Sequence, residues 1–330
     1  MQKQFSSPGV VDLHAASTTL ANGAILVDDY DSIVFDDLRR NFPAWDFIDK
    51  RPAPGDFTNG FDESAMGTAA FIAKRTLTFS GSSPSRAART PKEIKAITRD
   101  LEFGFYDRSV YKQQGMRFGD LTAKDVSDIT NSIMKIWNDA FYHGNATGSP
   151  LEFDGLKSLL AGPEVGATTS VVKTIQEKVV SMMNSVTKDV RPTHVLVNAR
   201  VRQIIVQEYR LAGAQNPEYV SSRGEKFAAI DTAAGDLPLV VDPFNSVVAG
   251  TANVYPTYIV SADKMSWQYI EPLGQGGPEP KIFEIVLNNA INQQFKGVMF
   301  GALEMLGAAA NHARLNILDR AVVITMVPTS

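Results

Sequence analysis

Residues 120–156 read DLTAKDVSDITNSIMKIWNDAFYHGNATGSPLEFDGL, and their first part predicts a long helix over residues 122–143. Thr122 and Asp125 have the spacing of a capping box, with Asp in place of the usual Glu or Gln. Gly144 is the residue type that commonly ends a helix in the left-handed conformation. Apolar side chains recur every three or four residues, at Val126, Ile129, Ile133, Ile136, Trp137, Ala140 and Phe141. Such a stripe covers one side only, so we expect the helix to lie across a sheet.

The helix is followed by a turn-rich link over residues 143–150 and then by Leu151-Glu152-Phe153-Asp154-Gly155-Leu156. A long amphipathic helix, a GN turn and the pattern P-x-E-F-x-G-L together resemble the major capsid proteins of tailed bacteriophages with the HK97-type fold. The resemblance implies that the helix is the spine of a peripheral domain. It also implies that the segment after Pro150 leads into an axial domain.

Composition narrows the function classes. The 330-residue chain is 44% hydrophobic and 21% charged, as is usual for a folded soluble protein. Its net charge of −4 argues against a general nucleic-acid binder, and the absence of cysteine excludes disulfides and thiolate metal sites. The polar start MQKQFSSPG is unlike a signal peptide, and no run of 18 apolar residues occurs. We therefore expect a soluble protein that is made inside a cell.

The segment before the helix has unusual organisation. Residues 1–30 are rich in Ser, Ala, Thr and Gly, which is typical of a disordered terminus. The resemblance implies an alternative, an arm that orders against neighbouring subunits. Residues 33–49 combine a short helical pattern with aromatic side chains, and residues 50–91 are rich in Gly, Pro, Ser and Thr. Alternation from Phe71 to Phe79 predicts a strand, but a ribbon of at most two strands cannot form its own core.

Charge is distributed unevenly over the same region. Residues 25–63 hold ten acidic side chains and four basic ones. Residues 74–99 hold one acidic side chain, Glu93, and seven basic ones, namely Lys74, Arg75, Arg86, Arg89, Lys92, Lys95 and Arg99. Charge runs are usually solvated faces, but opposite patches could also fix the register between identical neighbours. The resemblance implies that residues 51–91 contain the extended E-loop that reaches over the next subunit.

The rest of the chain predicts a layered α/β arrangement. Helices are expected over residues 169–187 and 200–211, the second with Asn198 as its N-cap and Gly213 at its end. Strands are expected over residues 94–117, 192–198, 237–241, 254–260, 282–287, 294–305 and 313–327. Pro256 predicts that its strand is an edge or is interrupted. The succession of helix, HVLVN strand and helix resembles the axial domain of the same capsid family.

No catalytic constellation is evident. The four histidines, His14, His143, His194 and His312, lie outside any HExxH or G-x-S-x-G setting. Asp28, Asp29 and Asp31 lack the glycine and the distant glutamate of a calcium loop, and the glycines of residues 274–277 lack the lysine of a phosphate-binding loop. Glu152 and Asp154 could be an acid/base pair, although a capped turn suits their apolar neighbours better. We expect no catalytic, cofactor-binding or metal-binding residues, and hence no enzyme.

These observations predict an α+β protein with the HK97-like capsid fold. Its expected parts are an N-terminal arm (1–32), a peripheral domain (33–50, 92–150 and about 282–330), an E-loop (51–91) and an axial domain (151–281). The resemblance implies self-assembly through hexamers and pentamers into an icosahedral shell around phage double-stranded DNA, in a virion made in the host cytoplasm. Implied further partners are scaffolding, portal and cementing proteins and, without sequence specificity, the packaged DNA; no membrane is expected. Two alternatives are an encapsulin-type nanocompartment shell and a cytoplasmic oligomeric α/β enzyme.

Overall fold

The structure is a computed structural model that describes residues 17–19, 24–27, 42–58, 61–65, 85–88, 90–103, 118–166, 169–184, 191–213, 217–220, 226–246, 253–272, 276–285, 293–307 and 311–319. Its helices are α2 (Pro43–Phe47), α4 (Phe118–His143), α5 (Leu156–Leu159), α6 (Val171–Met183), α7 (Ala199–Leu211) and the 3-10 turn η1 (Ala262–Lys264). The strands before α6 are β1 (Ser17–Thr19), β2 (Ala24–Val27), β3 (Asp49–Pro52), β4 (Phe61–Ala65), β5 (Ser85–Ala88), β6 (Lys95–Phe103) and β7 (Glu164–Val165). Later strands are β8 (His194–Val197), β9 (Glu218–Val220), β10 (Lys226–Thr232), β11 (Gly235–Val241), β12 (Val254–Val260), β13 (Met265–Ile270), β14 (Lys281–Ile285), β15 (Gln293–Met305) and β16 (Ala313–Leu318).

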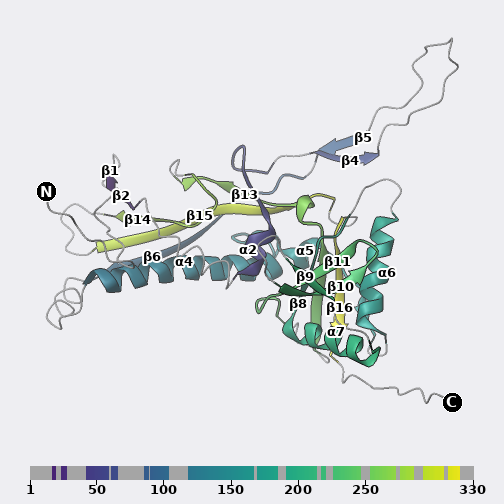
Figure 1. Cartoon of the computed structure of the whole chain (residues 1–330). Helices are drawn as coiled ribbons and strands as arrows, with labels where there is room; N and C mark the ends of the chain where they lie inside the picture. The colour runs from purple at the N-terminus through teal and green to yellow at the C-terminus, as the bar shows by residue number, and fades with distance from the viewer. Residues whose placement is uncertain are drawn as a thin grey trace, which may run out of the picture.

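The described strands form two seven-stranded sheets and a separate two-stranded ribbon. The first sheet has the order β1-β2-β14-β15-β13-β3, and β6 also pairs with β15. The second sheet has the order β7-β16-β12-β8-β11-β10-β9. Figure 1 shows α4 along the first sheet, α6 and α7 beside the second, and the β4–β5 ribbon projecting away from both. The predicted α+β class is confirmed.

The spine helix α4 begins earlier than the sequence predicts. It runs from Phe118 to His143, so Thr122 lies inside it and the predicted capping-box start is wrong by about one turn. A Thr and an acidic residue three positions apart can also occur within a helix, and spacing alone does not fix a boundary. The C-terminal end at His143 agrees with the prediction.

The buried side of α4 is also rotated from the predicted stripe. Burial comes in adjacent pairs at every fourth position, at Ile129 and Thr130, Ile133 and Met134, Trp137 and Asn138, and Phe141 and Tyr142. Ile136 falls outside this arc and is 52% exposed, so its predicted place against the sheet is wrong. The arc is displaced because the helix packs on the first sheet with one side and meets residues of the second sheet with the other.

Two glycines of β15 leave room for close packing on the first sheet, Gly297 for helix α4 and Gly301 for Trp267 of β13. A Cβ atom on Gly297 would lie 2.4 Å from Cγ2 of Ile129 and 2.7 Å from Cδ1 of Ile133. A Cβ atom on Gly301 would lie 2.2 Å from Cζ2 of Trp267. Helix α4 and the indole of Trp267 therefore pack directly against the backbone of β15.

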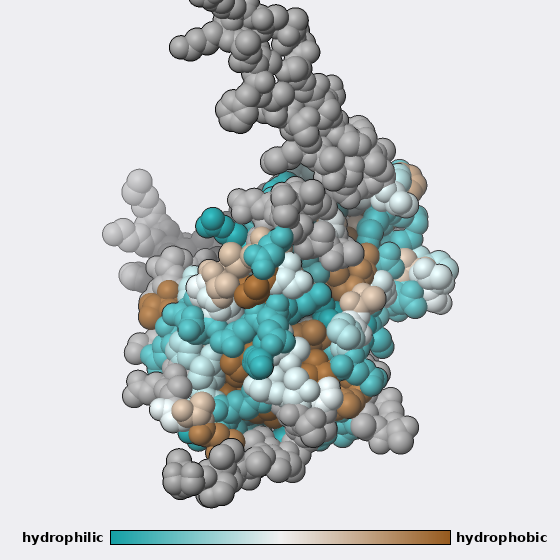
Figure 2. Space-filling view, turned by 90° about the vertical axis from the view of Figure 1, so that its right-hand side faces the viewer, coloured by the Kyte–Doolittle hydropathy of each residue, from teal (hydrophilic) through white to brown (hydrophobic). Residues whose placement is uncertain are grey.

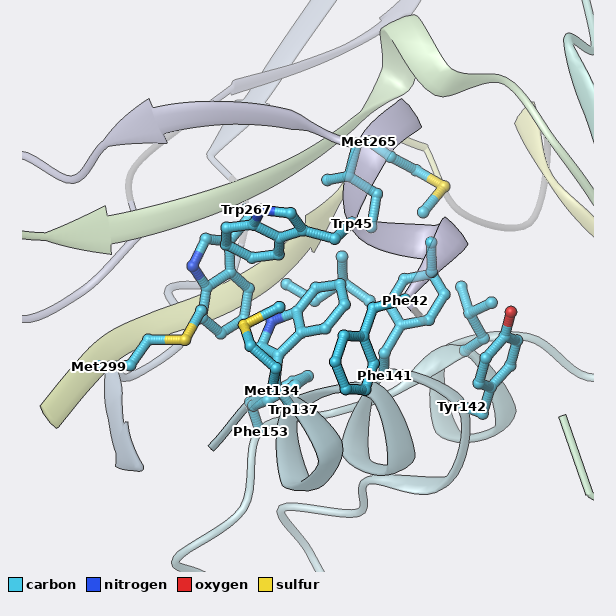
Figure 3. Packing of buried hydrophobic residues seen from close by; sticks show 14 of the residues in the cluster. Phe42, Trp45, Met134, Trp137, Phe141, Tyr142, Phe153, Met265, Trp267 and Met299 are labelled. Atoms are coloured by element: carbon cyan, nitrogen blue, oxygen red, sulfur yellow. The ribbon is translucent and has the colours of Figure 1, made fainter. Parts of the chain in front are cut away.

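Aromatic side chains fill the layer between α4, α2 and the first sheet. The rings of Trp137 and Trp267 meet edge to face with centroids 5.7 Å apart, and Trp45 of α2 meets Trp137 at 4.8 Å (Figure 3). The same buried cluster includes Leu196 and Tyr258 of the second sheet. A second cluster lies between the second sheet and helices α6 and α7. The first of these two clusters therefore contains side chains from both sheets.

Local predictions in the second layer are confirmed. Helix α7 is capped by the Asn198 side chain, which accepts a hydrogen bond from the backbone N–H of Arg200 at 2.9 Å. Gly213 follows the helix with a φ of +70°. Helix α6 is shorter than predicted, and it buries Val171, Ile175, Val179 and Met182.

The prediction that Pro256 places its strand at an edge or interrupts it is wrong. Strand β12 is continuous and lies between β16 and β8. However, β8 pairs with β12 only from Tyr258 to Val260, so Pro256 lies beyond the end of β8. The Pro256 carbonyl accepts a hydrogen bond from Nδ2 of Asn245 there, at 2.9 Å. Because the N and C=O of one strand residue point to the same side, the missing N–H falls where no ladder bond is needed.

The late strands do not follow the predicted grouping. Strand β16 pairs with β12 in the second sheet, so assigning all of residues 282–330 to the spine-helix domain is wrong for this strand. Strand β13, expected in the axial domain, pairs with β15 in the first sheet. The chain therefore crosses between the sheets at η1 and returns between β15 and β16.

The described part of the N-terminal arm adds two strands to the first sheet of its own chain. Strand β2 pairs with β14 of the same chain, and β1 pairs with β2. The remaining residues of the arm, and the predicted strand residues 320–327, lie outside the described residues.

Candidate assembly surface

The β4–β5 ribbon is the feature that the main body does not cover. Its two strands pair antiparallel, with Phe61 opposite Ala88. Figure 1 shows the ribbon extending away from both sheets. The alternating stretch from Phe71 to Phe79 lies outside the described residues, so the strand predicted there stays a prediction.

The ribbon leaves the body from a hydrogen-bonded root. The backbone N–H of Thr58 donates to the carbonyl of Lys92 at 2.8 Å, and the N–H of Lys92 donates to Oγ1 of Thr58 at 3.1 Å. Below this pair, the N–H of Ile94 donates to the carbonyl of Asp56 at 2.9 Å. Thr58 is only 2% exposed. The root is therefore part of the packed body, although the ribbon is not.

The turn after α4 is built on two glycines in close contact. A Cβ atom on Gly144 would lie 2.3 Å from the Phe153 carbonyl oxygen, and one on Gly155 would lie 2.3 Å from the Ala140 carbonyl oxygen. The N–H of Gly155 donates to the carbonyl of Gly144 at 2.9 Å. Gly144 is not in the left-handed conformation, so the predicted reason for this glycine is wrong. Close backbone approach, and not a positive φ, requires glycine there.

The two carboxylates of the EFDGL segment hold this turn in place. Asp154 Oδ1 accepts the N–H of Ala146 at 3.0 Å, and Glu152 Oε2 accepts the N–H of Asn145 at 3.3 Å. Asp154 Oδ2 also lies 3.5 Å from Nζ of Lys92 at the ribbon root. The carboxylates therefore cap a turn, which the sequence favoured over an acid/base pair.

A buried polar contact joins the spine helix to the second sheet. Asn138 and Asp242 are both fully buried, and Nδ2 of Asn138 lies 3.1 Å and 3.0 Å from the two carboxylate oxygens. Burial raises the pKa of Asp242, and the N–H of Phe244 and the Asn138 amide oppose that rise. Sequence reasoning missed this pair. The available sign was a polar residue in the centre of an apolar helix face, which needs a buried partner.

The described histidines occupy structural positions. His194 stacks on Phe47 with ring centroids 4.8 Å apart, and burial lowers its pKa to about 4. Burial likewise lowers the pKa of His312 to about 4, and its Nδ1 accepts the N–H of Ser261 at 3.3 Å. His143 Nε2 lies 2.9 Å from the hydroxyl of Ser246. His14 lies outside the described residues.

Apolar side chains are also exposed at the edge of the second sheet and at the turn after α4. Figure 2 views the chain from the side of the second sheet and shows scattered brown patches among hydrophilic residues. Strand β9 forms one edge of the sheet, with Tyr219 38% and Val220 56% exposed. At the turn, Leu151 is 85% exposed.

The described residues offer little for chemistry. Among them, no group of three or more His, Cys, Asp or Glu side chains could hold a metal ion. No helix within the described ranges is both long and apolar enough to span a bilayer. A hollow of about 420 Å³ beside the turn is lined by polar side chains, including His143, Asp154 and Lys157. Of these, His143 and Asp154 already contact Ser246 and Lys92.

Comparison with known proteins gives similarity only at the level of structure. No family model matches the sequence, and no curated protein matches it. The Cyanophage A-1(L) capsid has a TM-score of 0.60 and 12% identity, over 92% of this chain and 97% of that chain. The SrpI encapsulin complex from Synechococcus elongatus PCC 7942 has a TM-score of 0.59 and 12% identity, over 88% and 92%. The capsid of Myoviridae phage XM1 has a TM-score of 0.55 and 11% identity, over 83% and 91%. With its spine helix, projecting ribbon and two sheets, the chain has the HK97-type capsid fold.

Proposed function

We propose that this chain is the major capsid protein of a tailed bacteriophage. Many copies, arranged as hexamers and pentamers, form an icosahedral shell around double-stranded DNA, and the chain has no catalytic role. The observation that carries the proposal is the β4–β5 ribbon, which projects from the body on a buried root. The described ribbon pairs only with itself, so a surface for its faces must come from elsewhere.

The energetics of the ribbon support a neighbouring subunit as that surface. Ordering backbone costs about 1–2 kcal/mol per residue, and a two-stranded ribbon alone is marginal in water. A neighbour that covers one face of the ribbon offsets this cost. In a closed shell each subunit both gives and receives a ribbon, so individually weak contacts become collectively strong.

The proposed parts follow from this function. Residues 51–91 contain the E-loop, whose projecting part is residues 61–88 because Arg51 and Pro52 pair in the first sheet. Helix α4 is the spine of the peripheral domain, and the second sheet with α6 and α7 is the axial domain. The basic side chains of the ribbon itself, Lys74, Arg75, Arg86 and Arg89, meet acidic side chains of the neighbour, whereas Lys92 and Lys95 pair within their own subunit. Scaffolding, portal and cementing proteins are the further partners, and the shell contacts packaged DNA without sequence specificity.

A second candidate is an encapsulin-type shell, which encloses a cargo protein. The similarity to the SrpI encapsulin complex, at a TM-score of 0.59, favours it about as strongly as the cyanophage capsid at 0.60 favours a phage shell. Both candidates assemble, so the tests below apply to each. Nuclease-protected double-stranded DNA inside purified particles from infected cells supports the phage shell, and a single co-purifying protein cargo without DNA supports the encapsulin.

The decisive experiment removes the ribbon and keeps its root. Residues 61–88 are replaced by a short Gly-Ser linker, while Asp56, Thr58 and Lys92 stay because they belong to the packed body. We expect a monomer with unchanged circular dichroism that forms no closed shells by electron microscopy, whereas the full chain forms them. A full-length chain that stays monomeric or forms only small oligomers under all assembly conditions contradicts the proposal. A deletion variant that assembles normally contradicts the role of the ribbon.

A further inference from the structure

Lys92 has an unusual position for a lysine at the base of a projecting ribbon. Its backbone is paired with Thr58 at the root, but its side chain turns back toward the body. There Nζ lies 3.5 Å from Oδ2 of Asp154, in the turn after the spine helix, and the two side chains are only 26% and 28% exposed. The contact therefore joins the ribbon root to a segment 62 positions later in the sequence, the difference between 154 and 92.

Lysine normally keeps its amine in water, but the amine of Lys92 is withdrawn from solvent. Burial lowers the pKa of Lys92, and the carboxylates of Asp154 and Glu304 oppose that effect. Its Nζ atom is shielded from solvent and has no hydrogen-bond partner among the described residues. Lys95, three positions further along, makes a different contact, an ion pair with Glu93, and the two side chains are 16% and 58% exposed. That pair joins residues two positions apart, so it does not connect the ribbon root to the turn after the spine helix.

The partner of Lys92 is fixed independently of it. Asp154 Oδ1 accepts the N–H of Ala146, and the turn is clamped by the close packing of Gly144 against Gly155. Glu304, the second carboxylate near the amine, is 6% exposed in β15. The Lys92 amine thus meets a rigid anchor at the C-terminal end of the spine helix.

We propose that the Lys92–Asp154 ion pair is a strut that sets the direction in which the ribbon leaves its own subunit. The backbone pairs at the root fix where the ribbon begins, and the strut restrains its rotation about that root. A small rotation there becomes a large displacement along the ribbon, so the strut controls the curvature of the assembly. This last step rests on the proposed shell function, whereas the ribbon direction can be measured in a monomer.

The ion pair is suited to position and not to stability. Desolvation of two partly buried charges offsets most of their attraction, so replacing both partners with neutral side chains often costs little, whereas removing one leaves the other charge unpaired. Lys92→Met combined with Asp154→Asn therefore leaves the monomer about as resistant to urea as the wild type. Lys92→Arg keeps the cation, and Asp154→Asn removes the charge while keeping an oxygen for the N–H of Ala146.

The first test measures ribbon direction in the monomer by electron spin resonance. The chain has no native cysteine, so labels can be attached to introduced cysteines at Ser85 in β5 and at the exposed Lys135 in α4. We expect a narrow distance distribution in the otherwise wild-type protein and a broader one in Lys92→Met and Asp154→Asn. Lys92→Arg restores the narrow distribution, and Lys95→Met leaves it unchanged. Equal distributions in all five proteins overturn the strut.

The second test measures assembly. Shells of Lys92→Met are expected to vary in size and to be often open, those of Lys92→Arg and Lys95→Met to match the wild type. The double variant Lys92→Met with Asp154→Asn is no worse than either single change, because both remove the same interaction. Uniform wild-type shells from Lys92→Met, or an unfolded monomer of the double variant, contradict the inference. A wild-type chain that forms no shells contradicts the proposed function instead, and leaves the spin-label result standing.

Discussion

Alanine at Gly301 is expected to be the most disruptive of the small changes in the first sheet. Its Cβ atom would lie 2.2 Å from Cζ2 and 2.3 Å from Cε2 of Trp267. Carbon atoms are normally separated by about 3.5–4 Å, so the indole would have to move by more than about 1 Å. Trp267 is fully buried, with the ring of Trp137 edge-on at 5.7 Å and that of Phe153 at 5.1 Å. It therefore has no free space to enter.

The expected cost follows from two opposing terms. Overpacking of a core costs roughly 1–3 kcal/mol, and the rigid indole places Gly301→Ala at the upper end. Loss of unfolded-chain entropy on changing glycine to alanine returns about 0.4–1 kcal/mol. The net destabilisation is then about 2 kcal/mol. Gly297→Ala meets methyl groups, Cγ2 of Ile129 at 2.4 Å and Cδ1 of Ile133 at 2.7 Å, which are smaller than an indole ring, so we expect a smaller loss.

Gly55 supplies the matched control, because nothing lies within 4 Å of a Cβ atom built there. Urea unfolding of full-length monomer at low protein concentration, followed by tryptophan fluorescence, measures all three variants. The free energy of unfolding is compared at constant slope, since a changed slope would indicate a changed unfolded or native state. We expect the order Gly301→Ala, Gly297→Ala, wild type, Gly55→Ala, from least to most stable. A Gly301→Ala midpoint equal to that of Gly55→Ala would refute the close packing of Trp267 on β15.

Three further outcomes are expected. The pKa of His312 is about 4 in the folded chain against an ordinary 6.5, so its contribution is present above pH 6.5 and is lost as pH falls to about 4. The unfolded chain takes up the proton first, and the free energy of unfolding falls by about 3 kcal/mol over this pH range. In His312→Gln the urea midpoint should depend less on pH. A pH dependence equal to that of the wild type would be evidence against the burial of this imidazole. Asn198→Ala should lower stability by about 1 kcal/mol or more, because it loses both the α7 cap and the hydrogen bond that Nδ2 donates to the Asn245 carbonyl; Asn198→Ser keeps an oxygen for the N–H of Arg200 and should lose less, and equal losses would contradict capping. Denaturing gels of purified shells should show one band near 35.9 kDa, because strands β4 and β5 of the ribbon contain no lysine for a covalent cross-link; a ladder of multimers that Lys74→Arg abolishes would contradict this.

Much of the secondary structure and part of the assembly surface could be predicted from the sequence. The end of α4 at His143, the Asn198 cap and the end of α7 at Gly213 depend on contacts within a few residues, so local spacing predicts them. The turn-capping reading of Glu152 and Asp154 was also local, since both bind backbone N–H groups of the preceding link. The resemblance to capsid proteins implied an extended loop within residues 51–91, and the ribbon strands β4 and β5 lie in that range.

The tertiary structure alone decided features that depend on distant partners. Ile136 shares the helical period of its neighbours, yet it is exposed because the second sheet rotates the buried arc toward Asn138. A central strand can hold Pro256 because the neighbouring strand β8 ends before it reaches that position. The length of β8 cannot be predicted from the residues around position 256. Strand order likewise depends on contacts between segments far apart in the chain. The sequence therefore groups residues 313–318 with the spine helix, whereas β16 pairs with β12 in the second sheet.

The same reason separates the two halves of the Lys92 contact. The sequence by itself determined a basic segment beside the ribbon and an acidic turn after the spine helix, because charge and turn chemistry are written in neighbouring residues. Which of the seven basic residues between positions 74 and 99 meets Asp154 was decided only by folding. Pairing across that separation requires the first sheet, the root of the ribbon and the glycine-clamped turn to be assembled together.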